Sequence, residues 1–330
     1  MVSVMGKRGL FLVWLCLVNI LPGMAQTEKL IDYVNPFVGT DGYGNVYPGA
    51  QIPFGGIQMS PDTDSKYYDA ASGYKYNHST LLGFSLTHLS GTGIPDLGDF
   101  LFISGTGEMK LDPGTREEPE KGYRSRYSHE KEWASPNYYA VELSDYGVKA
   151  EMTSGVRSGM FRFTYPQSDK AFIMIDMNHT LWQSCEWANL RMENDSTITG
   201  YKLVKGWGPE RHIYFTATFS KKLTGLRFMQ NKKPVIYNTS RFRSSYEAWG
   251  KNLMACISFD TKAGEEVIVK TAISSVSTNG AKNNMAELAG LTFDDLKAKG
   301  EALWEKELGK YTLTAVSYTH LRAHETLANL

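Results

Sequence analysis

Short β-type segments recur along most of this 330-residue chain, and they constrain its fold more than any other feature. Between residues 27 and 277, runs rich in β-branched and aromatic side chains are separated by turn residues such as Pro166, Gly200 and Gly264. The clearest runs are residues 100–103, 138–143, 161–165, 171–176, 213–219 and 267–273. Several alternate apolar with polar residues, and no helical pattern lies between them. We therefore predict a mainly β fold, a large antiparallel β-sandwich (supersandwich).

The pattern changes after this region, where a helical composition begins. Residues 285–308 are rich in Ala, Leu, Glu and Lys, and Thr292 followed by two aspartates is typical of a helix N-terminus. We predict that residues 26–278 form the sandwich domain and that residues 279–311 form a helical linker. Residues 316–330 do not continue this composition and are similar to translated sequencing-adapter sequence, so we exclude them as an artefact tail.

The first 25 residues have the features of a secretory signal peptide. Lys7 and Arg8 precede an apolar stretch too short to span a bilayer comfortably, and small residues lead to a cleavage site after Ala25. No later run is apolar enough to cross a membrane. We therefore predict residues 1–25 as a leader and the protein as exported, periplasmic or extracellular, with no membrane span.

Export allows a disulfide between the two cysteines that follow the leader, Cys185 and Cys256. The alternative is two buried thiols, since a chain of this size builds a core that needs no covalent crosslink. We favour the thiols and leave the disulfide open.

Charge and composition favour a neutral ligand over a nucleic acid. Lys plus Arg and Asp plus Glu both number 35, whereas a polyanion-binding domain carries a basic excess. Residues 33–99 combine many Gly and Pro residues with aromatic, hydroxyl and carboxylate side chains. Such loops suit a sugar, because its hydroxyls need polar partners and its C–H face packs on aromatic rings. Residues 39–44 do not follow the GxGxxG order of a phosphate-binding loop.

Several collinear sequence blocks resemble the N-terminal domain of glycoside hydrolase family 92, the calcium-dependent exo-acting α-mannosidases. The blocks are NPFVGT, YPGAQIPFGGIQMSPDT, GFSLTHLSGTGIPDLGD, VRSGMFRFTYP, ITGYKLVKGW, YFTATFSK and ALWEKEL. They cover roughly residues 27 to 311, and their number and order make the resemblance specific.

The resemblance implies a two-part enzyme that hydrolyses terminal α-mannosides of glycans with inversion. A β-sandwich and helical linkers would lead to a larger C-terminal (α/α)6 catalytic domain. That domain would supply the Glu acid, the Asp base and most contacts to calcium, the implied cofactor. The chain ends where that domain would begin. We therefore expect no catalytic residue here, and expect the protein's partners to be an α-mannoside glycan and its own C-terminal domain.

By the same resemblance, the front domain contributes loops that complete the sugar pocket. We nominate eight residues of these loops as candidate sugar-binding residues: Asp41, Gly42, His88, Gly93, Ile94, Asp96, Asp99 and Trp207. The alternative for His88, Asp96 and Asp99 is a structural loop in which they satisfy turn amides. Ile94 departs from an aromatic residue that follows GTG in many relatives, so the linkage preference is left open.

The acidic and histidine residues of the chain lack metal-ligand spacing. Asp41, Asp62 and Asp64 are interpreted as turn residues, because no EF-hand-like spacing is present. The remaining histidines, His78, His129, His179 and His212, are interpreted as surface or hydrogen-bonded residues. We predict no metal site in this chain.

Two alternatives remain open. One is a freestanding secreted glycan-binding module without catalysis. The other is a complete small hydrolase that uses Asp96 and Asp99 as its carboxylates. Inverting hydrolysis disfavours the latter, because it needs the two carboxyl groups about 6.5–9.5 Å apart on opposite sides of a sugar ring.

Overall fold

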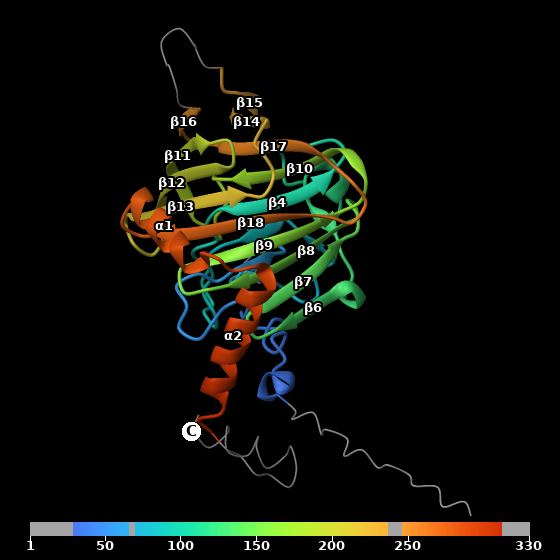
Figure 1. Cartoon of the computed structure of the whole chain (residues 1–330), viewed down its shortest axis with the longest axis vertical. Coiled ribbons are helices and arrows are strands. Elements are labelled where there is room, and N and C mark those ends of the chain that lie inside the picture. Colours follow the sequence, from blue (N-terminus) through green and yellow to red (C-terminus); the bar gives the residue numbers. More distant parts are fainter. Residues whose placement is uncertain (1–28, 66–69, 237–245, 312–330) are drawn as a thin grey trace, which may run out of the picture.

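Two antiparallel sheets face each other and form the body of the protein (Figure 1). The computed structural model describes residues 29–65, 70–236 and 246–311. The larger sheet has nine strands in the order β16 (Glu247–Gly250), β11 (Ser184–Asn194), β12 (Thr197–Lys205), β13 (Arg211–Phe219), β18 (Glu265–Ser274), β9 (Ser158–Tyr165), β8 (Val148–Ser154), β7 (Tyr138–Leu143) and β6 (Glu132–Ser135).

The second sheet has seven strands, and a small ribbon accompanies it. The order is β1 (Ser60–Asp62), β3 (Gly83–Ser85), β4 (Leu101–Thr106), β10 (Ser168–Asp176), β17 (Leu253–Thr261), β14 (Gly225–Gln230) and β15 (Lys233–Pro234). Strands β2 (Thr80–Leu81) and β5 (Ser125–Arg126) pair separately. Short 3-10 turns are η1 (Leu30–Tyr33), η3 (Pro119–Lys121), η4 (His129–Lys131) and η5 (Met285–Leu288).

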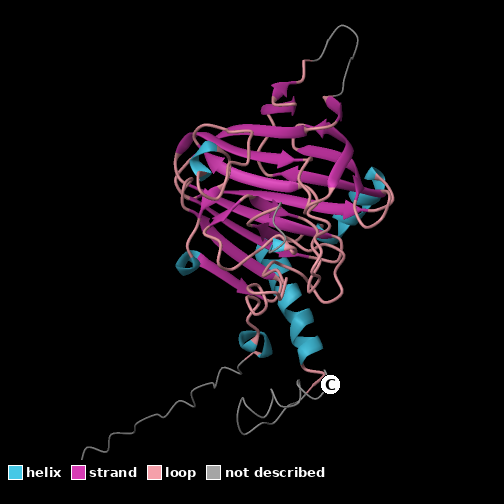
Figure 2. Cartoon of the chain, turned by 180° about the vertical axis from the view of Figure 1, so that it is seen from behind, coloured by secondary structure: helices cyan, strands magenta, loops and turns pink. Residues whose placement is uncertain are grey.

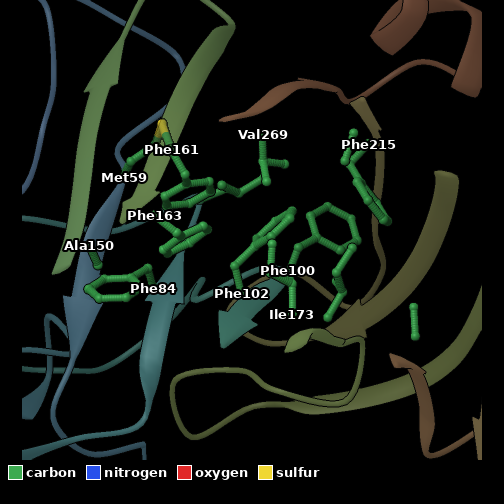
Figure 3. Close-up of a cluster of buried hydrophobic side chains, with 14 of the residues drawn as sticks. Met59, Phe84, Phe100, Phe102, Ala150, Phe161, Phe163, Ile173, Phe215 and Val269 are labelled. Carbon is green, nitrogen blue, oxygen red and sulfur yellow. The ribbon is translucent and has the colours of Figure 1, made fainter. Parts of the chain in front are cut away.

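The core lies between the two sheets and is dominated by phenylalanine. Strand alternation turns Phe161 and Phe163 inward, while Arg162 between them faces outward and bonds Glu151. The ring of Phe102 from the opposite sheet lies 5.0 Å from that of Phe161 (Figure 3). Each fully buried phenylalanine contributes about 1.5–3 kcal/mol by leaving water.

Each sheet also carries a smaller apolar cluster on its outer face. On the seven-stranded sheet, Leu101 and Met174 pack with Tyr123 from the segment between β4 and β5. On the nine-stranded sheet, Met160 packs with Phe293 and Leu296 of a helix. Strands of both sheets are therefore apolar on their two sides in places, which explains why strict alternation breaks down there.

That helix is α2 (Phe293–Leu308), which follows the short α1 (Thr278–Asn284). Thr292 and Asp295 cap it reciprocally, and this confirms the helix start expected from the sequence. Arg162 lies 4.3 Å from the Phe293 ring centroid, which fixes the first turn against the sheet.

The far end of α2 leaves the sheet and meets the beginning of the described chain, as seen from both sides of the molecule (Figures 1 and 2). Trp304 Nε1 donates to the Gln51 carbonyl at 2.7 Å, and Glu305 accepts from the Ile31 amide at 2.9 Å. The segment that carries most of the candidate loops is thus tied to the C-terminal helix.

The predicted fold class, a mainly β antiparallel sandwich followed by helices, is confirmed. All six segments predicted as strands lie in or overlap strands of the two sheets. The proposed leader, residues 1–25, and the tail, residues 316–330, lie outside the described residues. None of the helices in the described part of the chain is long and apolar enough to cross a bilayer.

The two cysteines are free and buried in different clusters. Cys185 belongs to the core between the sheets, and Cys256 lies in the outer cluster of the seven-stranded sheet. Burial raises the pKa of the Cys256 thiol to about 12 and also raises that of Cys185. Both groups are therefore neutral thiols at physiological pH, as favoured from the sequence.

We expect both thiols to be unreactive in the folded protein. In protein that lacks residues 1–25, Ellman's reagent at about pH 8 is expected to titrate neither Cys185 nor Cys256 until guanidinium unfolds the chain, because burial suppresses the thiolate. Two thiols should then appear without added reductant. A count of two only after reduction would contradict the structure and indicate a disulfide.

Candidate functional site

Residues 39–46 form a closed loop at the start of the described chain. The amide of Val46 bonds the carbonyl of Gly39 at 3.2 Å, and Asp41 Oδ1 accepts from the Gly42 amide at 2.8 Å. Gly44 must be glycine, since a Cβ there would lie 2.2 Å from the Gly39 carbonyl oxygen. The turn therefore leaves Asp41 and Gly42 exposed at its tip.

Hydrogen bonds join this loop to two others that are distant in sequence. The Gly91 amide donates to the Asn45 carbonyl at 2.8 Å, which links residues 39–46 to residues 91–97. The Trp207 amide donates to Asp96 Oδ2 at 3.1 Å, which links residues 91–97 to residues 206–209 between β12 and β13. We call these three connected loops the rim.

The outward side of the rim combines apolar and polar groups. Trp207 and Ile94 are 58% and 43% exposed. Gly93, next to Ile94, is also exposed, as are Asp41 and Gly42 on the first loop. A Cβ on Gly42 or Gly93 would meet no atom within 4 Å, so their backbone faces open space. Five of the eight nominated residues are therefore exposed on three loops that hydrogen bonds connect.

Asp96 lies under the rim and connects its loops. Its Oδ1 accepts from the Leu97 amide at 2.6 Å, and its Oδ2 accepts from the Trp207 amide. A Cβ on Gly206 would lie 2.8 Å from both carboxylate oxygens, so this glycine permits the close approach. Both carboxylate oxygens of Asp96 therefore accept backbone hydrogen bonds, which hold two loops of the rim together.

Asp99 is fully buried and forms a charged cluster with the nine-stranded sheet. Its carboxylate lies 2.6 Å from Arg211 and 3.2 Å from buried Lys202, and it accepts from the Thr87 hydroxyl at 2.7 Å. Burial alone would raise the pKa of Asp99, but Lys202 and Arg211 outweigh it and lower this pKa to about 2. Asp99 is therefore ionised at every physiological pH.

His88 lies in a second buried cluster with Asp62 and His179. The Nε2 atoms of His88 and His179 lie 2.8 Å and 2.7 Å from the two oxygens of Asp62. Burial would raise the pKa of Asp62, yet the two histidines lower it well below its usual range. Ser85 also contacts Nε2 of His88, at 3.0 Å, and Nδ1 bonds the Gln58 carbonyl. Serine and aspartate share one nitrogen, so this is not the relay of a serine hydrolase.

The three aspartates considered as calcium ligands have structural partners. Asp64 Oδ1 accepts from the Ser65 amide at 2.7 Å, as in a turn, and Asp62 faces the two histidines. Among the residues that the structure describes, no group of three or more His, Cys, Asp or Glu side chains could hold a metal. These residues do not fit a calcium site.

Sequence reasoning left out two features of this region. Tyr43 is fully exposed at the tip of residues 39–46, yet it was not nominated because an isolated tyrosine carries no spacing signal. Lys202 and Arg211 were not connected with Asp99, because their pairing spans more than 100 residues and depends on how the sheets stack. The sequence pattern identified the polar loops, but it did not show which of their residues are buried.

Comparison with known proteins places this fold in a defined group. The model of the glycosyl hydrolase family 92 N-terminal domain matches residues 33–274. A GH92 α-mannosidase from Bacteroides thetaiotaomicron is 90% identical, with a TM-score of 0.85, over 87% of this chain and 39% of that chain. A solved structure of that mannosidase contains mannoimidazole.

More distant relatives agree on the fold. A GH92 inverting mannosidase from the same organism is 24% identical with a TM-score of 0.73, which supports the architecture alone. An uncharacterized secreted glycosidase from Arthroderma benhamiae is 30% identical over 148 residues, 44% of this chain and 19% of that protein. The chain thus spans about two fifths of the solved mannosidases and one fifth of the curated relative.

The buried cluster around Asp99 makes a testable contribution to stability. We expect Asp99→Asn to lower the free energy of unfolding by about 3–5 kcal/mol, because it leaves Lys202 buried without its counter-charge. Urea denaturation measures this change. The exposed Asp41→Asn is the matched control and should change the value by less than about 0.5 kcal/mol. Equal effects of the two variants would contradict the role of Asp99.

The same carboxylate predicts a dependence of stability on pH. The pKa of Asp99 is about 2 in the folded chain and about 3.9 when unfolded. Its contribution is therefore present above pH ~4 and is lost as the pH falls from about 4 to 2, a difference of roughly 2 kcal/mol. Urea unfolding at several pH values should show a smaller loss over this window in Asp99→Asn than in the wild type. Parallel curves would argue against the assignment.

Proposed function

The chain belongs to glycoside hydrolase family 92, and we propose that it is the N-terminal domain of an exported α-mannosidase. In this proposal the whole enzyme hydrolyses terminal α-mannosides of glycans with inversion, and this domain completes the sugar pocket. The observation that carries the proposal is the rim, in which three loops are hydrogen-bonded into one exposed surface. The 90% identical α-mannosidase supports the substrate class.

The rim has the groups that a pyranose ring needs. Trp207 and Ile94 offer exposed apolar surface to the C–H face of a sugar. The Asp41 carboxylate and the open backbone at Gly42 and Gly93 offer partners for its hydroxyls. We assign direct sugar contact to these five residues. His88, Asp96 and Asp99 are assigned a positioning role, because they are buried beneath the loops.

The acid and the base are assigned to the part of the enzyme beyond this chain. Inverting hydrolysis needs one carboxylic acid at the leaving oxygen and one carboxylate at the attacking water. The oxygens of Asp96 and Asp99 are occupied by backbone amides and by cationic side chains. Neither group is therefore placed to move a proton at a sugar. Calcium, implied by the family, is assigned mainly to that same part of the enzyme, since the described residues hold no group of three or more His, Cys, Asp or Glu side chains that could bind a metal.

Export is part of the proposal. The charged and apolar pattern of residues 1–25 supports it, as does the name of the secreted relative from Arthroderma benhamiae. The protein partner in this proposal is the C-terminal catalytic domain, reached through helix α2. The alternative is a freestanding secreted glycan-binding module, which the exposed Trp207 on a carboxylate-bearing surface also favours.

The division of labour between domains predicts where activity resides. We expect the purified 330-residue chain to release no nitrophenol from 4-nitrophenyl α-mannoside, with or without calcium. The product of an open reading frame that continues beyond residue 311 should release it. Turnover by the chain alone that Asp96→Asn abolishes would overturn the proposal in favour of a small hydrolase. Glycan-array binding by the chain alone at micromolar affinity would favour the binding module.

The rim itself is tested in the longer enzyme. We expect Trp207→Ala to lower kcat/KM for an α-mannobiose by about 3- to 10-fold, as loss of one stacking face removes roughly 0.5–1.5 kcal/mol of binding. Trp133→Ala is the matched control, because Trp133 is 50% exposed on β6 and outside the rim. Equal kinetics of the two variants would place the sugar elsewhere.

A further inference from the structure

A cavity in the protein surface lies outside the rim. This cavity of about 730 Å³ opens among the end of β10, the start of β17, the β14–β15 turn and the segment between β4 and β5. Its volume is within the range of small-molecule sites, about 300–1,000 Å³. Its lining includes Trp182, Gln183, Asn178, Asp176, His179 and Asn252.

We propose that this cavity is an accessory binding site for a neutral saccharide. Its lining combines amide side chains, which both donate and accept hydrogen bonds, with an indole. Trp182 is 57% exposed on the cavity wall, and Asn178 projects from an exposed position two residues after Asp176. Amides beside an exposed aromatic face match the vicinal hydroxyls and the C–H face of a pyranose.

Trp182 is held in place by bonds on both sides of it. The Trp182 amide donates to the Ser65 carbonyl at 3.0 Å, and the adjacent Leu181 amide donates to the Leu97 carbonyl at 2.9 Å. Gln183 Nε2 donates to the Pro95 carbonyl at 2.9 Å. Trp182 itself has a left-handed backbone, with a φ of 65°. A bulky residue pays a conformational cost there, and such strain is often found at ligand sites.

The charges of the lining disfavour an anionic ligand. Among the described residues that line the cavity, Lys232 is the one lysine or arginine, and it forms an ion pair with Asp112. The Asp176 carboxylate accepts from the Tyr123 hydroxyl at 3.2 Å and from the backbone N–H of Asn178 at 2.8 Å. Among Asp112, Asp176 and Lys232 the carboxylates outnumber the ammonium group, which disfavours phosphate and suits an uncharged polyol. The described residues also contain no cluster that could hold a metal.

The rim segment from Pro95 to Leu97 is hydrogen-bonded to residues 181 and 183 on the cavity wall. This segment bonds Trp182's neighbours on one side and, through Asp96, the Trp207 amide on the other. A saccharide in the cavity would therefore lie next to the rim without using its residues. The cavity site does not depend on the catalytic proposal, because binding can be measured without turnover.

Binding of neutral oligosaccharides to the 330-residue chain tests this proposal. Calorimetry and ligand-observed NMR would use an α-mannohexaose and a maltohexaose, with inorganic phosphate as the anionic probe, each up to about 10 mM. We expect saturable binding of at least one hexaose, weakened at least about 10-fold by Trp182→Ala and by Asn178→Ala. Trp187→Ala is the matched control, since Trp187 is 46% exposed on β11 and outside the cavity lining.

The rim variant separates the two proposals. Hexaose bound at the rim is the part of the signal that Trp207→Ala removes, and hexaose bound in the cavity is the part that Trp182→Ala removes. Loss of hexaose binding in Trp207→Ala but not in Trp182→Ala would overturn the cavity and leave the rim as the sugar site. No saturable binding of either hexaose, or binding of phosphate that Trp182→Ala abolishes, would also overturn it. Circular dichroism and thermal unfolding of each variant establish that a lost signal is not lost folding.

Discussion

The buried ion pairs of Asp99 are the interaction on which the arrangement of the loops depends. Asp99 comes just before β4 of the seven-stranded sheet, whereas Lys202 and Arg211 come from β12 and β13 of the nine-stranded sheet. The carboxylate therefore ties the two sheets together at one end of the sandwich. Lys202 also donates to the His179 carbonyl at 2.5 Å and extends the tie toward Asp62 and His88. Removing a buried charge costs more than the pair contributes, so these groups must be kept together.

The three hydrogen-bonded loops of the rim lie above this charged cluster. The charged interior leaves the hydrophobic core between the sheets intact and holds three loops in contact above it. Binding surfaces on loops need such rigid support, because a loop alone loses its geometry to conformational entropy. Helix α2 adds a second support, since Glu305 bonds Ile31 before the first loop and Trp304 bonds Gln51 after it. The domain is thus built to present a surface, and its carboxylates are used to hold that surface.

Particular residues show how far sequence reasoning reached. Residues 138–143 are rich in aromatic and β-branched side chains and predicted strand β7 with its bounds, and Thr292 predicted the start of α2, because both signals are local. The same loops that supplied the candidate residues gave no sign of their burial. His88, Asp96 and Asp99 occur in one polar, glycine-rich segment with Ile94, yet only Ile94 is exposed among these four. Asp96 and Asp99 are held by partners more than 100 residues away, and His88 bonds Gln58 and Asp62 from a separate segment, which no local pattern reports.

The sequence by itself determined the fold class and the family, because strand patterns, composition and collinear blocks are properties of the chain, whereas the structure settled the two free thiols. Only the tertiary structure decided which of the nominated polar residues are exposed and which are buried against partners. It also brought Asn178 and Trp182 into a cavity that the sequence did not indicate. The physical reason is that hydrogen bonds and ion pairs between distant strands form only when two sheets stack. Their partners are therefore chosen by packing and not by spacing along the chain.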